Sequence, residues 1–259
     1  MVDLYPDGCQ TVRRTMPPYA GRIVIAAGYG LRACPAMSSI MSITLEWLGH
    51  CSFRLVSNGG PSVLIDPFDE TIGLRLPPYD CDILLISHSH YDTAAKHLVP
   101  PEYEAVRSKG TSLVKGLAIN ALPWWHDQRQ GKDYGSVLMF HFELDGFRVV
   151  YLSHIGCVPR QWAIDELKGA DICFIPVGGV FALGPKDAAE LARELAPKLI
   201  LPMHFNLRHL SFTLGPLSDF TKLMSDSLVV KDWRVEIEPE DLPSSPNVLL
   251  MRHWPGVAP

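Results

Sequence analysis

Leu84-Leu85-Ile86-Ser87-His88-Ser89-His90-Tyr91-Asp92-Thr93 is the stretch that decides the fold of this chain. It begins as a short apolar run, which indicates a buried strand because polar residues bound it. Two histidines and an aspartate follow at alternate positions. Sheets of α/β proteins bind their ligands at the carboxyl ends of strands, so these side chains stand where a ligand is expected. Imidazoles and a carboxylate together are typical ligands of zinc, manganese or iron.

The composition allows a sizeable hydrophobic core. The chain has 259 residues, 47% of them hydrophobic and 20% charged, with a formal net charge of −5. Nucleic acid is not expected as a partner, because phosphate binding requires a basic face and the Lys and Arg residues are scattered. No segment reaches the roughly 18 to 20 apolar residues of a membrane span, so no membrane is expected either.

The six cysteines show no CxxC pair and no regular spacing. A zinc knuckle or a disulfide framework is therefore not expected. The simpler interpretation is a reducing compartment, and we expect a cytoplasmic protein.

Residues 1–40 differ from the rest of the chain. Prolines interrupt them, and no helical or strand period persists. We interpret them as a poorly ordered or atypical N-terminal extension. An export signal is the alternative, disfavoured because Pro17, Pro18 and Arg22 separate Arg13-Arg14 from a short apolar segment. The regular pattern begins at Met41, and residues 41–259 are expected to form a single domain.

From Met41 onward the chain is rich in strands first and mixes in helices later. Strands are expected at 43–48, 51–56, 62–65, 82–86, 111–114, 117–122, 136–144, 147–152, 171–177, 199–202, 229–237 and 248–251. Helices are expected near 102–108, after Pro100-Pro101, and at 160–168, 185–195 and 217–224. This order of elements predicts two packed sheets with helices outside.

Five of the ten histidines share one context, a loop directly after an apolar run: His88, His90, His126, His154 and His204. If the strands align in sheets, these loops converge on one edge, and several imidazoles with a carboxylate bind zinc well. The alternative for each is an ordinary core or surface histidine. His50 follows a glycine at a strand turn, where we expect it to support the ligands by hydrogen bonding.

These motifs resemble the metallo-β-lactamase superfamily, and more closely its branch of predicted metal-dependent hydrolases, the relatives of ascorbate-6-phosphate lactonase. The resemblance rests on residues 47–53 (Trp-Leu-Gly-His-Cys-Ser-Phe), 65–67, 88–92, 175–179 and 202–204. It implies an α/β (α+β) fold, a four-layer αββα sandwich of two mixed β-sheets with helices outside. It also implies that Asp66 lies in an acidic turn behind the site.

The same resemblance implies a set of metal ligands. His88, His90 and His126 would hold a first metal, and Asp92 and His204 would belong to a second. Two positions depart from the family pattern: Thr93 replaces a histidine, and His154 replaces a bridging aspartate. A neutral imidazole offers one lone pair and cannot bridge two cations. We therefore expect one tightly held metal per chain, zinc first, with manganese or iron as alternatives.

The expected chemistry is metal-assisted hydrolysis. A metal-bound hydroxide would attack an ester, lactone, amide or phosphodiester of a small-molecule substrate. Asp92 would orient the hydroxide and pass on a proton, and His154 would complete the coordination sphere or carry a proton. Candidates for the pocket wall, with the arginines holding an anionic group, are Trp124, Trp125, Arg129 and Arg208. Surface packing is the alternative role for these four residues.

Two other classes of function stay open. The altered ligands could mark a metal- or ligand-binding protein without hydrolytic activity on the same scaffold, because fold does not fix function. A redox enzyme of the flavodiiron kind is a weaker alternative, since the chain has no evident flavin domain and lacks the bridging carboxylate. Measured turnover separates hydrolase from binding protein.

Overall fold

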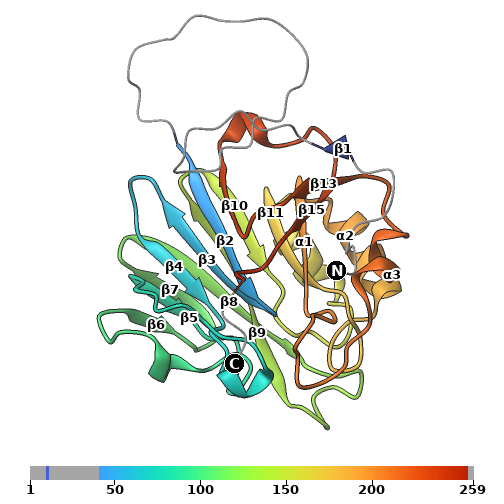
Figure 1. Ribbon diagram of the computed structural model, residues 1–259, viewed down its shortest axis with the longest axis horizontal. Coiled ribbons are helices and arrows are strands. Elements are labelled where there is room, and N and C mark those ends of the chain that lie inside the picture. The colour runs from blue at the N-terminus through green and yellow to red at the C-terminus, as the bar shows by residue number, and fades with distance from the viewer. Residues whose placement is uncertain (1–9, 12–40, 256–259) are drawn as a thin grey trace, which may run out of the picture.

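Short strands and tight turns build two mixed β-sheets in the computed structural model, which describes residues 10–11 and 41–255. Figure 1 shows the sheets packed on each other, with the α-helices beside the nine-stranded sheet. The predicted fold class, two mixed sheets with helices outside, is confirmed. The expectation for residues 1–40 lies outside the described residues, except for a two-residue strand, β1 (Gln10–Thr11).

The smaller sheet has the order β14 (Arg234–Ile237), β2 (Ile43–Gly49), β3 (Ser52–Ser57), β4 (Ser62–Ile65), β5 (Ile83–Leu85) and β6 (Glu104–Val106). The larger has the order β1, β13 (Ser227–Val230), β15 (Asn247–Met251), β12 (Leu199–Met203), β11 (Ile172–Pro176), β10 (Phe147–Tyr151), β9 (Ser136–Leu144), β8 (Leu117–Trp125) and β7 (Gly110–Val114). The helices are α1 (Gln161–Leu167), α2 (Pro185–Leu195) and α3 (Leu217–Thr221), and the 3-10 turns are η1 (Glu70–Ile72), η2 (Lys96–Leu98) and η3 (Pro239–Asp241). Among the described residues, no helix has the length and apolar character to cross a membrane.

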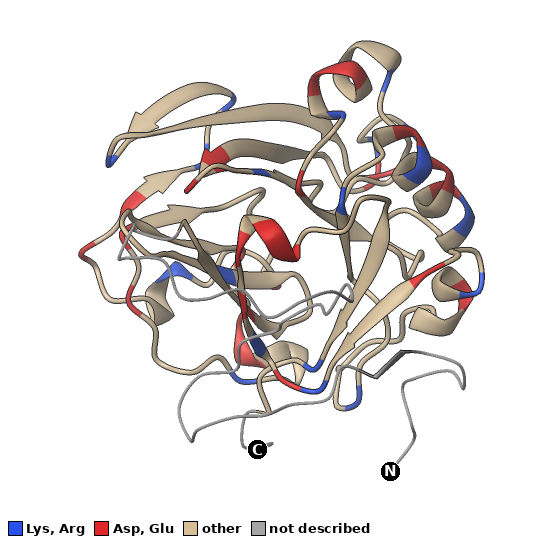
Figure 2. Cartoon of the chain, turned by 90° about the horizontal axis from the view of Figure 1, so that it is seen from above, with Lys and Arg blue, Asp and Glu red and all other residues tan. Residues whose placement is uncertain are grey.

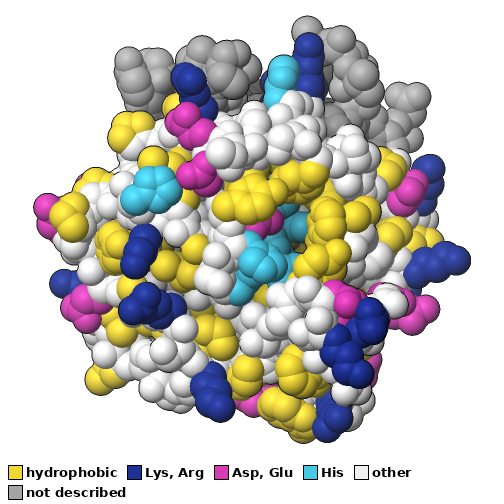
Figure 3. All heavy atoms as spheres, turned by 90° about the horizontal axis from the view of Figure 1, so that it is seen from below, with side chains coloured by type: hydrophobic (Ala, Val, Ile, Leu, Met, Phe, Trp, Pro, Cys, Tyr) yellow, Lys and Arg dark blue, Asp and Glu magenta, His cyan; other side chains and the backbone are white. Residues whose placement is uncertain are grey.

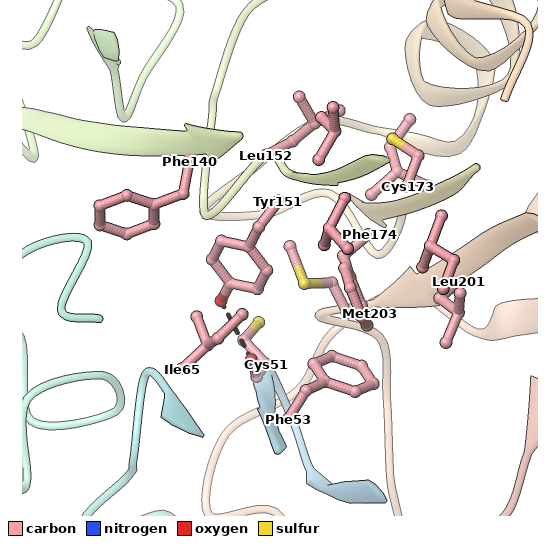
Figure 4. Close-up of a cluster of buried hydrophobic side chains, with 14 of the residues drawn as sticks. Cys51, Phe53, Ile65, Phe140, Tyr151, Leu152, Cys173, Phe174, Leu201 and Met203 are labelled. Atoms are coloured by element: carbon pink, nitrogen blue, oxygen red, sulfur yellow. Dashed lines mark hydrogen bonds between the residues drawn. The ribbon is translucent and has the colours of Figure 1, made fainter. Parts of the chain in front are cut away.

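Aromatic side chains from both sheets meet in the core (Figure 4). Phe53 on β3 packs against Phe174 on β11 with ring centroids 4.4 Å apart. Each such fully buried side chain contributes about 1.5 to 3 kcal/mol of stability. The Tyr151 hydroxyl lies 2.7 Å from Asp66 Oδ2 and 3.0 Å from the Cys51 carbonyl oxygen, so a polar link joins the sheets inside this core.

Two sequence predictions were wrong because of tertiary pairing. Residues 102–108 form no helix but contain β6, which pairs in parallel with β5. Glu104 N–H donates to the Asp82 carbonyl oxygen, so this segment supplies hydrogen bonds to a strand that would otherwise be an edge. The single strand predicted at 229–237 is two strands, since β13 pairs with β15 and β14 with β2, in different sheets. By contrast, α2 has the predicted bounds and buries the predicted apolar face.

Acidic and basic residues are interspersed along the described chain, and Figure 2 shows no continuous basic stretch within it. Cys51, Cys81, Cys157 and Cys173 are free thiols, so the described part of the chain contains none of the disulfides that the sequence argued against.

The strand directions bring several strand ends to one edge. β10, β11 and β12 are parallel, and β8 shares their direction because it is antiparallel to β9. In the other sheet, β4 and β5 are parallel, and β2 shares their direction through β3. The loops that follow these seven strands therefore emerge together.

Two glycines let these loops approach each other. A Cβ at Gly156 would lie 2.3 Å from the His126 carbonyl oxygen, and one at Gly178 would lie 2.2 Å from that of His204. Both glycines donate backbone hydrogen bonds across the same contacts, to Trp125 and His204 respectively. No side chain fits between these backbones, so the positions require glycine.

Gly156→Ala is expected to lower the free energy of unfolding by about 1 to 3 kcal/mol, because the added methyl group overlaps backbone atoms that cannot move freely. Thermal unfolding followed by circular dichroism measures this loss. Gly59→Ala is the control, since a Cβ there meets nothing within 4 Å. Equal melting temperatures for the two variants would show that the contact at Gly156 is not tight.

Candidate metal centre

Six histidines and one aspartate gather where the loops emerge. Each follows a strand of the converging set: His50 after β2, His88, His90 and Asp92 after β5, His126 after β8, His154 after β10 and His204 after β12. Neighbouring rings lie close, with centroids 4.8 Å apart for His88 and His126 and 4.4 Å apart for His154 and His204. Figure 3 shows histidine side chains at the bottom of a hollow rimmed by hydrophobic ones. The five histidines singled out from the sequence do meet.

Their ligand atoms form overlapping sets within 4.8 Å: His88 with His126 and His154, His88 with His90 and Asp92, and His50 with Asp92, His154 and His204. The first two sets share His88. The third set shares His154 with the first and Asp92 with the second. The geometry thus offers two adjacent positions for a cation.

Buried atoms without partners mark the same place. In the described residues, eight buried side-chain nitrogen or oxygen atoms lack a hydrogen bond, and six of these belong to His50, His88, Asp92, His126 and His204. Each such atom costs about 1 to 3 kcal/mol when left unpaired. A divalent cation would use these lone pairs, and imidazoles with one carboxylate are the donor set of zinc. The residues present therefore fit a metal.

A chain of hydrogen bonds orients His88. Its Nδ1 lies 2.9 Å from Ser87 Oγ, and the Ser87 hydroxyl donates to Asp66 Oδ2 at 2.6 Å. The Ser87 backbone N–H donates to Asp66 Oδ1, and the Tyr151 hydroxyl also donates to this carboxylate. These contacts leave His88 Nε2 as the free nitrogen, buried and unpaired. Asp66 thus lies behind the site, where the family resemblance placed an acidic turn.

Burial keeps the central imidazoles neutral. It lowers the pKa of His88 to about 3, with repulsion from the His126 ring as the next cause. Burial also holds the pKa of His154 and of His204 well below the ordinary value, and repulsion from other imidazoles adds to it. Neutral nitrogens are the form that binds a metal.

Asp92 stays ionised at the centre of the cluster. Burial alone would raise its pKa, but the contact with His50 and the other nearby imidazoles lower it below the ordinary value. Its Oδ2 lies 3.2 Å from His50 Nε2 and 3.8 Å from His154 Nδ1, while Oδ1 has no partner. This is the single carboxylate within the ligand sets.

Backbone strain accompanies the site. His50, Asp66, Ser153 and His204 all adopt positive φ angles, between 45° and 56°, although none is glycine. Left-handed conformations of such residues cost of order 1 kcal/mol or more each and cluster at functional sites. At these four strand ends the left-handed conformation turns the chain sharply.

Cys51 is a site residue that the sequence analysis missed. Its Sγ lies 2.8 Å from His154 Nε2 and is fully buried. This contact occupies one ring nitrogen, so only Nδ1 of His154 faces the ligand sets. The sequence shows Cys51 as an ordinary strand residue beside His50, and no local pattern links it to a position 103 residues away.

A pocket of about 270 Å³ opens over the histidines. Its wall is aromatic, formed by Tyr91, Tyr134, Phe181 and Phe212 together with site residues. The four residues predicted as its wall lie elsewhere. Trp124 is buried and donates to the Cys157 carbonyl oxygen, Trp125 is 41% exposed, Arg129 pairs with Asp133, and Arg208 is exposed. Sequence spacing placed the tryptophans in a loop beside His126, but strand β8 extends through both of them, so their side chains alternate between the two faces of the sheet.

A second pocket, of about 520 Å³, is lined in part by His88, a member of the cluster, and by Ser89. Lys96, Arg107 and Lys109 line it, and no acidic side chain does. These three residues are exposed, and their cationic groups have no ion-pair partner among the described residues. Positive charge therefore lies beside the cluster, on the side of His88.

Comparison with known proteins agrees with this geometry. The family model of the Beta-lactamase superfamily domain matches residues 44–204. A metal-dependent hydrolase of Thermococcus onnurineus is 29% identical over 220 residues, which is 73% of this chain and 95% of the relative. A protein from Parabacteroides distasonis proposed to be a metal-dependent hydrolase shares the fold, with a TM-score of 0.56 at 20% identity, over 82% of this chain and 93% of that one.

A third comparison is with Thermotoga maritima, whose proposed zinc-dependent hydrolase of the metallo-β-lactamase superfamily gives a TM-score of 0.68. The two chains are 30% identical, and the match covers 82% of this chain and all of the other. The family match and this relative confirm the resemblance found in the sequence. The chain belongs to the metallo-β-lactamase superfamily, in its branch of metal-dependent hydrolases.

Proposed function

We propose that this protein hydrolyses an ester, lactone, amide or phosphodiester bond of a small molecule at a metal held by His88, His90, His126 and His154. The observation that carries the proposal is the convergence of these imidazoles, among them His88 and His126, whose buried nitrogens lack a hydrogen-bond partner in the described residues. When bound, a divalent cation supplies a water of lowered pKa and polarises the bond to be cleaved.

The residues around the metal position would then transfer protons, complete the metal ligands and bind the substrate. Asp92 Oδ1 faces the cluster unpaired, so it can accept the proton of the attacking water and later give it to the leaving group. His154 binds through Nδ1, because Cys51 occupies Nε2. Tyr134, Phe181 and Phe212 hold the apolar part of the substrate and limit the access of water.

The substrate is proposed to be anionic. The pocket over the histidines contains no Lys or Arg, whereas the neighbouring pocket presents Lys96, Arg107 and Lys109 without acids. A substrate that reached from the reactive centre past His88 would place a phosphate or carboxylate among these cations. This arrangement takes the role that the sequence analysis gave to Arg129 and Arg208.

The proposed metal is zinc, with manganese or iron as alternatives, and one ion per chain is held tightly. Zinc is favoured because the set contains nitrogen donors rather than several carboxylates. The side chain of Thr93 does not contribute, since its hydroxyl donates to the backbone carbonyl oxygens of His88 and His90. The free thiols favour the reducing cytoplasm as the location.

His88→Ala is expected to remove the tight metal and with it all turnover, because His88 belongs to two of the ligand sets. Elemental analysis of the purified protein gives the metal content. Turnover is measured with a panel of lactones, phosphodiesters and β-lactams, with and without a chelator. His97→Ala is the control, since this exposed histidine pairs with Asp69 and belongs to none of the ligand sets in the described residues. A metal-loaded wild-type protein that turns over none of the panel would favour a binding protein instead.

Ser87→Ala tests the orientation of His88. The variant breaks the link between His88 Nδ1 and Asp66, and loss of such an outer partner weakens metal affinity by about 10- to 100-fold. Zinc affinity is measured by competition with a fluorescent chelator. Ser89→Ala is the matched control, because Ser89 is exposed and its hydroxyl makes no hydrogen bond within the described part of the chain. Identical affinities of the two variants would contradict the orienting role.

Arg107→Ala tests the anionic substrate. Loss of a charge-assisted contact is expected to raise KM for bis(4-nitrophenyl) phosphate about tenfold and to leave KM for the neutral ester 4-nitrophenyl acetate unchanged. Lys231→Ala, at an exposed lysine outside this pocket, is the control. If Arg107→Ala changes KM for the two substrates by the same factor, the cations of this pocket do not select for an anionic substrate.

A further inference from the structure

We propose that His50 is a metal ligand, and that it forms with Asp92 and His204 a second, weaker cation site. Neither the family comparison nor the sequence pattern assigns this role to His50. The inference rests on the proposed function, because the second position adjoins the first metal. It concerns how this chain compensates for Thr93, which cannot serve as the missing ligand.

The direction of His50 comes from the local backbone. Strand β2 is irregular between Trp47 and Gly49, and the turn then passes through Gly49 at φ 122° and His50 at φ 48°. Irregular ladders at strand ends re-aim side chains. The His50 side chain is fully buried and points into the cluster, and its ring centroid lies 4.9 Å from that of His204.

The distances suit a shared cation. His50 Nε2 and Asp92 Oδ2 are 3.2 Å apart. Two ligands of a tetrahedral zinc ion, with bonds of about 2.0 to 2.1 Å, stand about 3.3 Å apart. The ligand atoms of His50, Asp92 and His204 lie within 4.8 Å of one another. A modest movement of His204 would bring all three within bonding distance of one cation.

The unpaired atoms favour a cation over a simple hydrogen bond. A single hydrogen bond from His50 to Asp92 leaves His204 Nδ1 buried without a partner among the described residues. A bound cation uses the lone pairs of His50 Nε2 and of one His204 nitrogen. The His50 proton then moves from Nε2 to Nδ1, so His50 needs no change of net charge.

The second site is the weaker one for two reasons. It has three protein ligands, because the single free nitrogen of His154, Nδ1, can bind only one metal. In addition, no carboxylate bridges the two cations, so their repulsion is less well compensated than by the aspartate that His154 replaces. Asp92 is the only carboxylate in the ligand sets of the described residues.

The test is calorimetric titration of chelator-treated full-length protein with zinc chloride, with elemental analysis of the product. Wild-type protein is expected to show two binding events, one tight and one weaker. His50→Gln, which retains a donor toward Asp92, should weaken the second event by at least about 100-fold and leave the first in place, because a direct ligand matters more than an outer partner. His97→Gln is the control and should keep both events.

The outcomes separate this inference from the proposed function. One event in the wild-type protein, or two in His50→Gln, overturns the second site and leaves the hydrolase proposal standing. No event in the wild-type protein overturns both. If His50→Gln does not fold, anomalous diffraction from zinc-soaked wild-type crystals decides. A second zinc peak within about 2.1 Å of a His50 nitrogen supports the inference, and its absence at saturating zinc overturns it.

Discussion

The structure depends on a cluster of buried polar atoms that lack hydrogen-bond partners at one edge of the sandwich. Seven of the eight buried unpaired polar atoms among the described residues lie in His50, His88, Asp92, His126, Ser153 and His204. Each of these atoms that stays without a partner lowers the stability of the folded protein by about 1 to 3 kcal/mol. Because they are concentrated in one place rather than dispersed, metal binding can satisfy several of them together. The apolar core between the sheets must be stable enough to hold this cluster assembled.

The scaffold holds the cluster through its strand directions and its turns. Strands β2, β4, β5, β8, β10 and β12 all end at the same edge, so residues far apart in sequence become neighbours without long loops. Left-handed residues such as Ser153 and His204 then turn the chain at once, and Gly156 and Gly178 allow the loops to touch. The local strain is compatible with a stable protein because the sheets beneath are fully packed.

The sequence predicts what depends on local pattern. Periodicity located α2, and the His88-Ser89-His90 motif after an apolar run located the centre of the site. Prediction from the sequence fails where contacts between residues far apart in the chain determine the structure. The segment around Glu104 became a strand because β5 needed a partner, and Cys51 entered the site through a fold-dependent contact with His154. Tyr134, Phe181 and Phe212 form the pocket wall from separate loops, and no spacing in the sequence connects them.

The replacement of a bridging carboxylate by His154 changes the charge of the centre. With Asp92 as the only carboxylate in the ligand sets, a bound divalent cation leaves a net positive charge at the reacting position. Asp66 does not offset this charge fully, because burial raises its pKa to about 7 and it stands behind Ser87. A positive centre attracts anions and strengthens the polarisation of a bound carbonyl or phosphoryl oxygen. Lys96, Arg107 and Lys109 extend the same field along the adjoining pocket, which would favour anionic substrates in both places.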